Sequence, residues 1–559
     1  MNDFHRNRAA IGALVACFVL VSLYVLSIRT LVPPDEGRYA EMAREMFASG
    51  DWITTRLDGI KYFEKPPLQA WMNALTFTLF GVGEWQARLW TGLCGIGGVL
   101  LTAYTASRVC GGRAGLYAAL VLGSSFYWLL GSQVDSVDMS LSAMMTLALC
   151  SLLLAQRDGA GPQAQRNWML ACWAGMALAT LSKGLVGVVL PGGVLVVYLL
   201  LVRDRGLAAR LHAGKGLALF FAIAAPWFVL VALKNPEQPH FFFIHEHFER
   251  FLLKEHHREA PPWVFLALLS VGSLPWAGVL VQSLLAGARR RGDAAGGAQE
   301  PGFHPRLLAL VWLVFIVAFF SASSSKLPGY ILPVFPALAL LIGCYLEGAG
   351  RKHRVVNAAL FALVGAGLLG VAPFITHFAR HDGEAALYAT WVPWVCTAGM
   401  LALGGGLLGT WMARHRQSDA YVLTLALTAF CASQLLLAGF EPMARARAGV
   451  NMLPAIQSGL TPATRVYSVG IYEQSLTFYL GRPVTLVDYE DEFGFGLKQQ
   501  PGLGIASLDA FAREWQSNMA RGIPCVAIAR ADLVEALRKR GLHLRVVVSD
   551  ARRTIIVNH

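Results

Sequence analysis

Apolar runs of near-spanning length recur along most of this 559-residue chain, and they constrain its fold more than any other feature. A helix that crosses a bilayer needs about 20 predominantly apolar residues. We find about thirteen runs that approach this length, at residues 11–28, 88–107, 114–132, 139–155, 167–182, 185–202, 216–233, 263–286, 307–322, 329–346, 355–376, 388–412 and 420–440. The hydrophobic fraction of 55% and the charged fraction of only 15% agree with this pattern. The sequence therefore predicts a polytopic α-helical membrane protein and excludes a string of ordinary soluble domains.

The first apolar run follows a short basic segment that contains Arg6 and Arg8, as the apolar core of a secretory signal peptide does. A cleaved signal peptide is therefore one interpretation of this segment. The run is nearly long enough to span a bilayer, however, and no cleavage site of small residues precedes Pro33 and Pro34. We therefore expect a retained membrane anchor.

Cationic residues are concentrated in alternate short loops between the apolar runs. They are Arg108, Arg113, Arg157, Arg166, the cations of 203–215, 289–291 and 351–354, Arg414 and Arg416. The positive-inside rule places these loops in the cytoplasm, so we expect the N-terminus inside and, after an odd number of spans, the C-terminal region outside. The net charge of +12, from 47 Lys and Arg against 35 Asp and Glu, follows from this rule and from anionic lipid, and requires no nucleic-acid partner.

Two of the expected outside loops are long, residues 29–87 and 234–262, and long loops are where functional residues concentrate. Within the first loop, residues 36–47 have helical spacing with apolar and charged side chains on different sides. This pattern predicts a helix lying along the membrane interface. Residues 68–80 are apolar but short for a crossing, so we expect a second interfacial or re-entrant helix there.

The composition changes after the membrane region, which we assign to residues 1–443. In residues 444–559, β-rich runs alternate with helical patterns, which predicts a soluble α/β domain outside the membrane. This region contains no GxGxxG between a strand and a helix, no Walker A motif and no GxSxG motif. Nothing in the sequence therefore marks it as the catalytic unit.

The cysteines show no disulfide framework and no metal-finger spacing. All nine except Cys525 lie in or beside the apolar runs, where a cysteine side chain acts as a small hydrophobe. Cys525 is the single cysteine of the C-terminal region, which therefore cannot close a disulfide on itself.

Acidic residues gather where the expected outside loops meet the membrane. Asp35 and Glu36 follow the first apolar run, and Asp135 and Asp138 lie in a short loop on the same face. A carboxylate within the hydrocarbon costs ~2.5–3.5 kcal/mol on insertion scales, so such groups usually serve a site or a partner. One interpretation is that Asp35, Glu36 and Asp138 cap the helices that follow them. The other is that they are catalytic carboxylates on facing walls of a site.

Cations and tyrosines also lie on this expected face. Lysine binds a phosphate as a point charge and arginine binds it as a bidentate fork, so they predict a site for a phosphate headgroup. The alternative interpretation of each cation is a side chain that snorkels to the membrane interface. The same two interpretations apply to Lys183. The candidate phosphate-binding residues are Arg38, Lys65, Arg250, Lys326 and Tyr330, and the candidate substrate-binding residues are Tyr39, Tyr62 and Asp135.

Five strings of the sequence resemble the bacterial lipid A aminoarabinose transferases, the ArnT family. This family belongs to the glycosyltransferase C superfamily and is related to the protein O-mannosyltransferases. The strings are PPDEGRYAEMAREM at 33–46, DWITTRLDGIKYFEKPPLQAW at 51–71, DSVDM at 135–139, HFERF at 247–251 and KLPGYILP at 326–333. YFEKPPL and KLPxYILP are the discriminating strings, because an acidic first loop marks the whole superfamily. The C-terminal region has no matching motif.

The resemblance implies a thirteen-span protein that transfers 4-amino-4-deoxy-L-arabinose, with inversion, from undecaprenyl phosphate to a phosphate of lipid A. The reaction would take place at the periplasmic face of the bacterial inner membrane and would confer resistance to polymyxin and other cationic antimicrobial peptides. The implied roles are a first-loop catalytic carboxylate, a supporting carboxylate and a set of cations around the carrier phosphate. The corresponding residues here are Asp35, Asp138, and Lys65, Arg250 and Lys326.

A divalent metal ion is an open alternative at this site. Members of the superfamily often use one, of the Zn²⁺ or Mg²⁺/Mn²⁺ type, which makes Glu64 and His245 candidate ligands. His245 and His247 are two residues apart, so on a helix they diverge and do not bind one ion together. Two ligands from distant segments are weaker evidence than a full coordination set.

Two other functions compete with this assignment. A protein O-mannosyltransferase-like enzyme would use a similar lipid-linked donor with a hydroxyl acceptor. A flippase for lipid-linked sugars is a competitor of another class, but we find neither inverted halves nor paired broken spans with midplane charges. A purely structural role would leave the acidic and basic loops unexplained.

Overall fold

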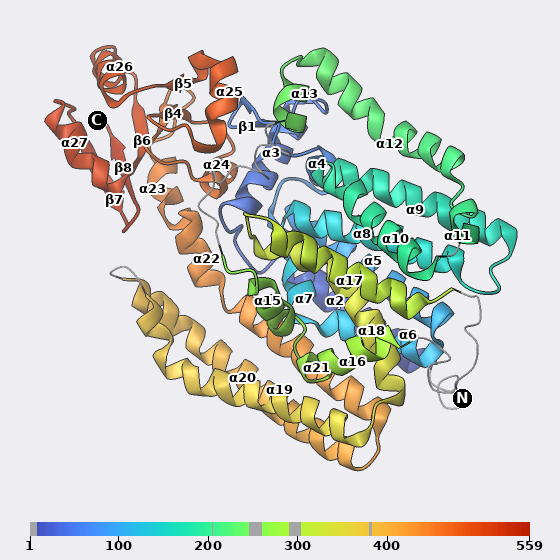
Figure 1. The fold of residues 1–559 in the computed structure, drawn as a ribbon. Coiled ribbons are helices and arrows are strands. Elements are labelled where there is room, and N and C mark those ends of the chain that lie inside the picture. Colours follow the sequence, from blue (N-terminus) through green and yellow to red (C-terminus); the bar gives the residue numbers. More distant parts are fainter. Residues whose placement is uncertain (1–7, 204, 245–259, 290–302, 380–382, 559) are drawn as a thin grey trace.

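The structure is a computed structural model that describes residues 8–203, 205–244, 260–289, 303–379 and 383–558. A bundle of long helices occupies most of the molecule, and a smaller sheet-containing domain lies at one end of it (Figure 1). The helices of the bundle are α2 (Arg8–Val25), α5 (Glu84–Val109), α6 (Gly112–Ser124), α7 (Phe126–Ser132), α8 (Val137–Gln156), α9 (Pro162–Lys183), α10 (Val186–Val202), α11 (Arg205–Ala209), α12 (Ala213–Lys234), α13 (Gln238–His240), α15 (Val264–Gly272), α16 (Leu280–Ala288), α17 (Pro305–Ala322), α18 (Phe335–Gly348), α19 (Arg351–Val371), α20 (Glu384–Arg414) and α21 (Ser418–Ala438).

Each of the thirteen predicted apolar runs is helical over most of its length within the described residues. By length and apolar composition, eight described helices are able to cross a membrane, or up to ten if two bent pairs are counted as spans. The bent pairs are α6 with α7, at 65°, and α15 with the segment 277–288, at 116°. Helices α2 and α10 contain shorter apolar segments, whereas α9 begins with a polar turn and is not among these candidates. The chain is therefore a polytopic helical membrane protein.

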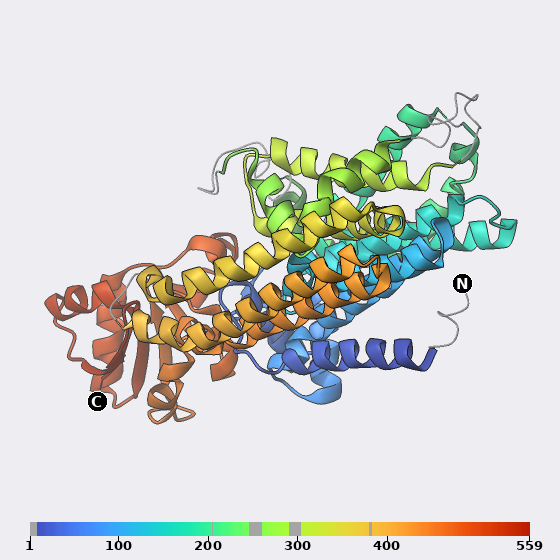
Figure 2. The same ribbon diagram turned by 90° about the horizontal axis from the view of Figure 1, so that it is seen from below.

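The helices differ in how deeply they are buried in the bundle. In α8 and in the segment Pro328–Gly348, 83% of the most apolar window is buried, so these helices form the centre. In α12 and in Arg351–Phe378 the buried shares are 22% and 33%, which leaves apolar side chains facing outward, as contact with lipid requires. Helix α2 runs from the N-terminal end of the bundle toward the end where the sheet domain lies (Figure 2).

The first long loop folds into a small layer between the bundle and the sheet domain. It consists of α3 (Asp35–Ser49), the hairpin strands β1 (Arg56–Leu57) and β2 (Ile60–Lys61), and α4 (Leu68–Phe80). Both predicted helices of this loop are present. The charged side of α3 does not face water, because Glu41 and Glu45 are buried together with its apolar side chains. The sheet domain covers α3 and removes its charged side from water.

The C-terminal domain contains a six-stranded sheet, as the β-rich runs predicted, with strand order β5-β4-β3-β6-β8-β7. Strands β3, β4, β5 and β6 are parallel to their neighbours in that group, and β8 is antiparallel to β6 and β7. The strands are β3 (Arg465–Val469), β4 (Thr485–Val487), β5 (Gly504–Ile505), β6 (Cys525–Arg530), β7 (Arg545–Ser549) and β8 (Arg553–Val557). The helices are α22 (Glu441–Ala448), α23 (Leu453–Gln457), α24 (Gln474–Leu480), α25 (Gly494–Gln499), α26 (Leu508–Ala520) and α27 (Val534–Lys539).

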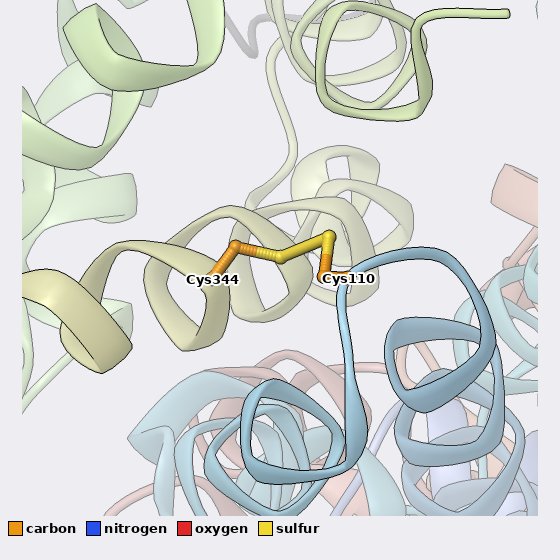
Figure 3. The surroundings of a disulfide bond; sticks show 2 residues. All are labelled: Cys110 and Cys344. Carbon is orange, nitrogen blue, oxygen red and sulfur yellow. A yellow bond between two sulfur atoms is a disulfide. The ribbon is translucent and has the colours of Figure 1, made fainter.

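A disulfide joins Cys110, in the turn between α5 and α6, to Cys344 in α18 (Figure 3). The bond links positions 234 residues apart in the sequence. The interpretation of these two cysteines as small hydrophobes is therefore wrong. The sequence contains no spacing that pairs them, because only the packing of α18 against α6 brings them together.

A buried arginine joins strand β8 to α22 within the C-terminal domain. Arg553 is 1% exposed, and its guanidinium donates to the carbonyl oxygens of Ala446 (2.6 Å) and Arg447 (3.2 Å) in α22. It also forms ion pairs with Asp550 (3.0 Å) and Glu473 (3.6 Å). Strand β8 is thereby fixed to the helix that follows the last predicted span.

We expect Arg553→Ala to destabilise the C-terminal domain by about 3–5 kcal/mol, because it leaves buried carboxylate and carbonyl groups without their partner. Thermal unfolding of the detergent-purified protein would measure the loss. Arg540→Ala is the matched control, because Arg540 pairs with Asp509 in the same domain but is 37% exposed. Equal stability of the Arg553→Ala and Arg540→Ala variants would contradict this role.

A buried acidic cluster lies where the first loop meets the C-terminal domain. Both oxygens of Glu45 accept from the backbone N–H of Gly59 at 3.0 Å, and Asp58 accepts from the backbone N–H of Val484 at 2.7 Å. Glu41 is fully buried and paired with Arg44 at 2.7 Å. Burial, together with the charge of Glu41, raises the pKa of Glu45 to about 8, and burial raises the pKa of Asp58.

These raised pKa values predict a pH-dependent stability. A carboxyl that stays protonated in the folded protein stabilises it fully below the unfolded pKa of 4.5, and this contribution is lost as the pH rises toward 8. We therefore expect a lower unfolding temperature at pH 8.5 than at pH 5.5. Glu45→Gln should reduce this difference, whereas Glu535→Gln, which removes an exposed carboxylate of the C-terminal domain, should not. An unchanged pH dependence in Glu45→Gln would refute the assignment.

Candidate active site

A buried ion pair fixes the start of α3, where the first acidic motif lies. Glu36 is 1% exposed, and Arg88 of α5 donates to its two carboxylate oxygens at 2.6 and 2.9 Å. The backbone N–H groups of Val32 (2.8 Å) and Asp135 (3.1 Å) also donate to Glu36. Burial opposes ionisation, but the neighbouring guanidinium groups of Arg88 and Arg29 hold the pKa of Glu36 below its ordinary value. Glu36 is thus a charged anchor, and we place it outside the reacting set.

Asp135 is a second buried anchor. Its carboxylate is 0% exposed and accepts from the side-chain amides of Gln69 (2.7 Å) and Asn73 (2.8 Å), both in α4. Burial raises the pKa of Asp135, and these amide donors oppose the rise. This contact ties α4 to the loop between α7 and α8. Asp135 has no exposed surface for a substrate, contrary to the predicted substrate-binding role.

Asp35, the neighbour of Glu36, has a different environment. Its side chain is 55% exposed and forms an ion pair with Arg38 at 2.6 Å. The same guanidinium donates to Glu492 of the C-terminal domain at 2.6 Å, and Glu492 also accepts from the hydroxyl of Tyr62 at 3.2 Å. Among the predicted carboxylates of the first motif, Asp35 is therefore the one that a substrate can reach.

Asp138 lies in a cluster with Lys183 and Tyr330. The ammonium of Lys183, the last residue of α9, forms an ion pair with Asp138 and lies 4.8 Å from the centre of the Tyr330 ring. Gly329 lies directly against this carboxylate, and any Cβ at that position would clash with Asp138. This contact gives a physical reason for the glycine in KLPGYILP.

Tyr39 shows that the predicted acidic walls lie near one another. Its ring is 5% exposed, and the charges of Asp35, Asp138 and Glu64 all act on its hydroxyl. Burial and these carboxylates raise the pKa of Tyr39 well above its ordinary value, although Arg38 opposes them. Tyr39 and Tyr62 both belong to the apolar core shared with the C-terminal domain.

The remaining predicted cations occupy separate positions. The ammonium of Lys65 donates to the carbonyl oxygen of Glu64 (2.8 Å) and lies 3.6 Å from its carboxylate. Lys326 donates to the carbonyl oxygen of Ser323 (2.7 Å), and within the described ranges it has no carboxylate partner. Arg250 and His245 lie outside the described residues.

The proposed metal ligands stay a prediction. In the part of the chain that the structure describes, no three His, Cys, Asp or Glu side chains form a group that could hold a metal ion. Glu64 faces Lys65, and its predicted partner, His245, is not described.

Sequence reasoning missed several residues of this site. Arg88 offered a signal, because an arginine at the start of an apolar helix is costly unless it is paired. The sequence indicates that Lys183 is comparable to the other candidate cations, but it does not indicate that Lys183 pairs with Asp138. Glu492 gave no signal, because it comes from a domain without a recognised motif and is 454 residues from Arg38.

Comparison with protein families matches two parts of the chain. Residues 452–558 match the aminoarabinose transferase C-terminal domain. Residues 64–230 match the dolichyl-phosphate-mannose-protein mannosyltransferase family. The first match covers the domain in which the sequence showed no motif.

Curated relatives and solved structures extend the similarity to nearly the whole chain. The undecaprenyl phosphate-α-4-amino-4-deoxy-L-arabinose arabinosyl transferase of Edwardsiella ictaluri is 33% identical over 408 residues, which are 71% of this chain and 69% of that protein. One such enzyme of Sodalis glossinidius is 32% identical, over 75% and 73% of the two chains. The crystal structure of ArnT from Cupriavidus metallidurans bound to undecaprenyl phosphate is 37% identical, with a TM-score of 0.92 over 99% of this chain and 98% of that one.

The family resemblance in the sequence is confirmed by these matches, which include both the bundle and the C-terminal domain. The chain belongs to the aminoarabinose transferase (ArnT) family of membrane glycosyltransferases.

Proposed function

We propose that this protein transfers 4-amino-4-deoxy-L-arabinose from undecaprenyl phosphate to a phosphate of lipid A, and so confers resistance to polymyxin and other cationic peptides. The observation that carries this proposal is the exposed carboxylate of Asp35, held by Arg38 near the Asp138–Lys183 ion pair. The named activity of the relatives and the undecaprenyl phosphate bound to the Cupriavidus protein support the choice of donor.

The acceptor chemistry suits this site. A lipid A phosphate is already an oxyanion at neutral pH, so its oxygen attacks the anomeric carbon without a strong general base. The bond from that carbon to the carrier phosphate breaks, and the electron pair leaves with the phosphate. A single displacement inverts the anomeric centre and forms no glycosyl-enzyme intermediate.

Two further roles, binding of the sugar's ammonium group and stabilisation of the departing phosphate, follow from the charges of the described residues. Asp35 pairs with Arg38 through Oδ1, and among the described residues Oδ2 remains available to bind the ammonium group of the aminosugar. Lys65 in the first outside loop and Lys183 at the end of α9 stabilise the phosphate that departs, as fixed cations do in other phosphate-releasing sites. Asp138 orients Lys183, and Tyr330 covers its ammonium.

The orientation is part of the proposal. The cation-rich loops place the N-terminus in the cytoplasm, and the C-terminal domain lies at the opposite end of the bundle (Figure 2). The site contacts that domain through Arg38 and Glu492. Both observations favour a site at the periplasmic face of the inner membrane.

A hydroxyl acceptor is the second candidate, and the match of residues 64–230 to the mannosyltransferase family favours it. Such an acceptor needs a base to take its proton, and Asp35 would then have that role. Lipid A would remain unmodified by a well-expressed enzyme of this kind.

Asp35→Asn should abolish sugar transfer in cells. We expect an aminoarabinose mass increment on lipid A when the intact protein is expressed in a polymyxin-sensitive strain that lacks its own transferase. With Asp35→Asn the increment should fall by about 10²-fold or more, because the ammonium or the acceptor loses its charged partner. Mass spectrometry of lipid A measures both.

Asp419→Asn is the control, because Asp419 is similarly exposed and paired with Arg113, but it lies at the end of α21 far from this site. No increment from well-expressed intact protein, in cells shown to contain the donor lipid, would refute the proposed acceptor.

Lys183→Gln should reduce transfer by about 10²-fold, since it removes a fixed cation and leaves Asp138 without its partner. Initial rates with purified protein in liposomes that contain donor and lipid A would show the loss. Lys234→Gln removes a cation that pairs with Asp51 at 2.9 Å, and it should retain near-normal rates. A wild-type rate for Lys183→Gln would remove Lys183 from the site.

A further inference from the structure

Helix α25 of the C-terminal domain contacts both long outside loops. Its Gly496 lies directly against β2 of the first loop, where any Cβ would clash with the carbonyl oxygen of Lys61 and the side chain of Ile60. The side chain of Gln500, just after α25, accepts from the backbone N–H of Lys61 at 2.9 Å. The close approach therefore fixes the register of α25 on the hairpin.

Phe495 of α25 joins the two loops. Its ring stacks on Phe241, at the start of the second loop, with a centroid distance of 4.0 Å and an interplanar angle of 22°. On another side it meets Phe63 of the first loop edge-on at 6.2 Å. Aromatic pairs in such geometries contribute more than their buried area alone. One side chain of the C-terminal domain thus contacts a residue from each loop.

A polar contact beside this trio supports the same arrangement. The ammonium of Lys61 forms an ion pair with Glu237 of the second loop at 2.6 Å. Both side chains are 21% exposed, so the pair is only partly screened by water. The two loops are therefore in direct contact next to Phe495.

Phe63 connects this contact to the charged residues of the site. It is 1% exposed and lies in the sequence between Tyr62 and the pair Glu64 and Lys65. The cluster that buries it includes Leu181, two residues before Lys183. A displacement of Phe63 would therefore move Lys65, which is close to it in the sequence, and Lys183, which follows Leu181.

We propose that Phe495 is a positioning residue for donor binding. Its ring holds the first outside loop against the second and thereby keeps Lys65 and Lys183, the cations near Phe63, in position to bind the carrier phosphate. The inference rests on the proposed function for the identity of the donor. It gives the C-terminal domain a part in substrate affinity through Phe495 and Gly496, which are uncharged.

The test is steady-state kinetics of the full-length purified protein with the undecaprenyl phosphate-linked aminosugar as donor. Phe495→Ala should raise KM for the donor about tenfold with a much smaller change in kcat. Without the ring, part of the binding free energy of the donor is used to order the loop. Phe495→Tyr keeps the ring and should restore KM. Phe241→Ala should give a similar rise, and the double variant should show no further rise, because the residues act as one unit.

Leu503→Ala is the matched control, since Leu503 belongs to the same domain, is 42% exposed and is not part of the hydrophobic cluster that contains Phe63, Phe241 and Phe495. An unchanged KM in Phe495→Ala, additive effects of the two variants, or a fall in kcat and unfolding temperature at constant KM would each overturn the proposal.

Hydrogen–deuterium exchange separates a failure of this loop contact from a failure of the proposed function. In Phe495→Ala, the amides of residues 60–65 and 236–243 should exchange faster than in the wild-type protein and in Leu503→Ala. If the wild-type protein transfers no aminoarabinose, the proposed function is wrong. The contact that Phe495 makes between the two loops is then tested by hydrogen–deuterium exchange alone. Unchanged exchange in both segments would overturn this contact.

Discussion

The buried ion pair between Arg88 and Glu36 is the interaction on which the site depends. Two charges removed from water are costly unless the geometry is good and their remaining hydrogen bonds are satisfied. Here the guanidinium also donates to the carbonyl oxygens of Leu26 (3.0 Å) and Thr30 (3.0 Å), where the chain leaves α2. A single arginine therefore fixes the end of the first membrane helix, the start of α3 and, through Glu36, the loop that contains Asp135 and precedes α8.

Environment alone separates the roles of three neighbouring carboxylates. Glu36 lies between guanidinium groups, Asp135 is buried among amides, and Asp35 is 55% exposed and paired with Arg38. The two buried groups hold the backbone rigid, and this rigidity keeps the exposed one in place. A site assembled on such anchors needs little reorganisation when a charged substrate arrives.

The sequence predicted the membrane architecture well, because spanning length and cation placement are local properties. The catalytic roles of Asp35 and Asp138, which the family resemblance implies, stay a prediction. Prediction from the sequence failed where the answer lies in long-range packing: the buried charged side of α3, the disulfide between Cys110 and Cys344, and the pairing of Arg38 with Glu492. The hydrophobic periodicity of a helix does not indicate which of its surfaces is covered by a domain that is distant in the sequence.

The distance in sequence between Arg38 and Glu492 has a consequence for biosynthesis. The first loop is synthesised early, but the carboxylate that holds Arg38 and Tyr62 comes from one of the last segments to leave the ribosome. Until that segment has been synthesised and folded, the charged side of α3 lacks the cover that the C-terminal domain provides. The enzyme thus completes its site only when the whole chain is present, and a nascent or truncated chain inserted in the bilayer would remain inactive toward its lipids.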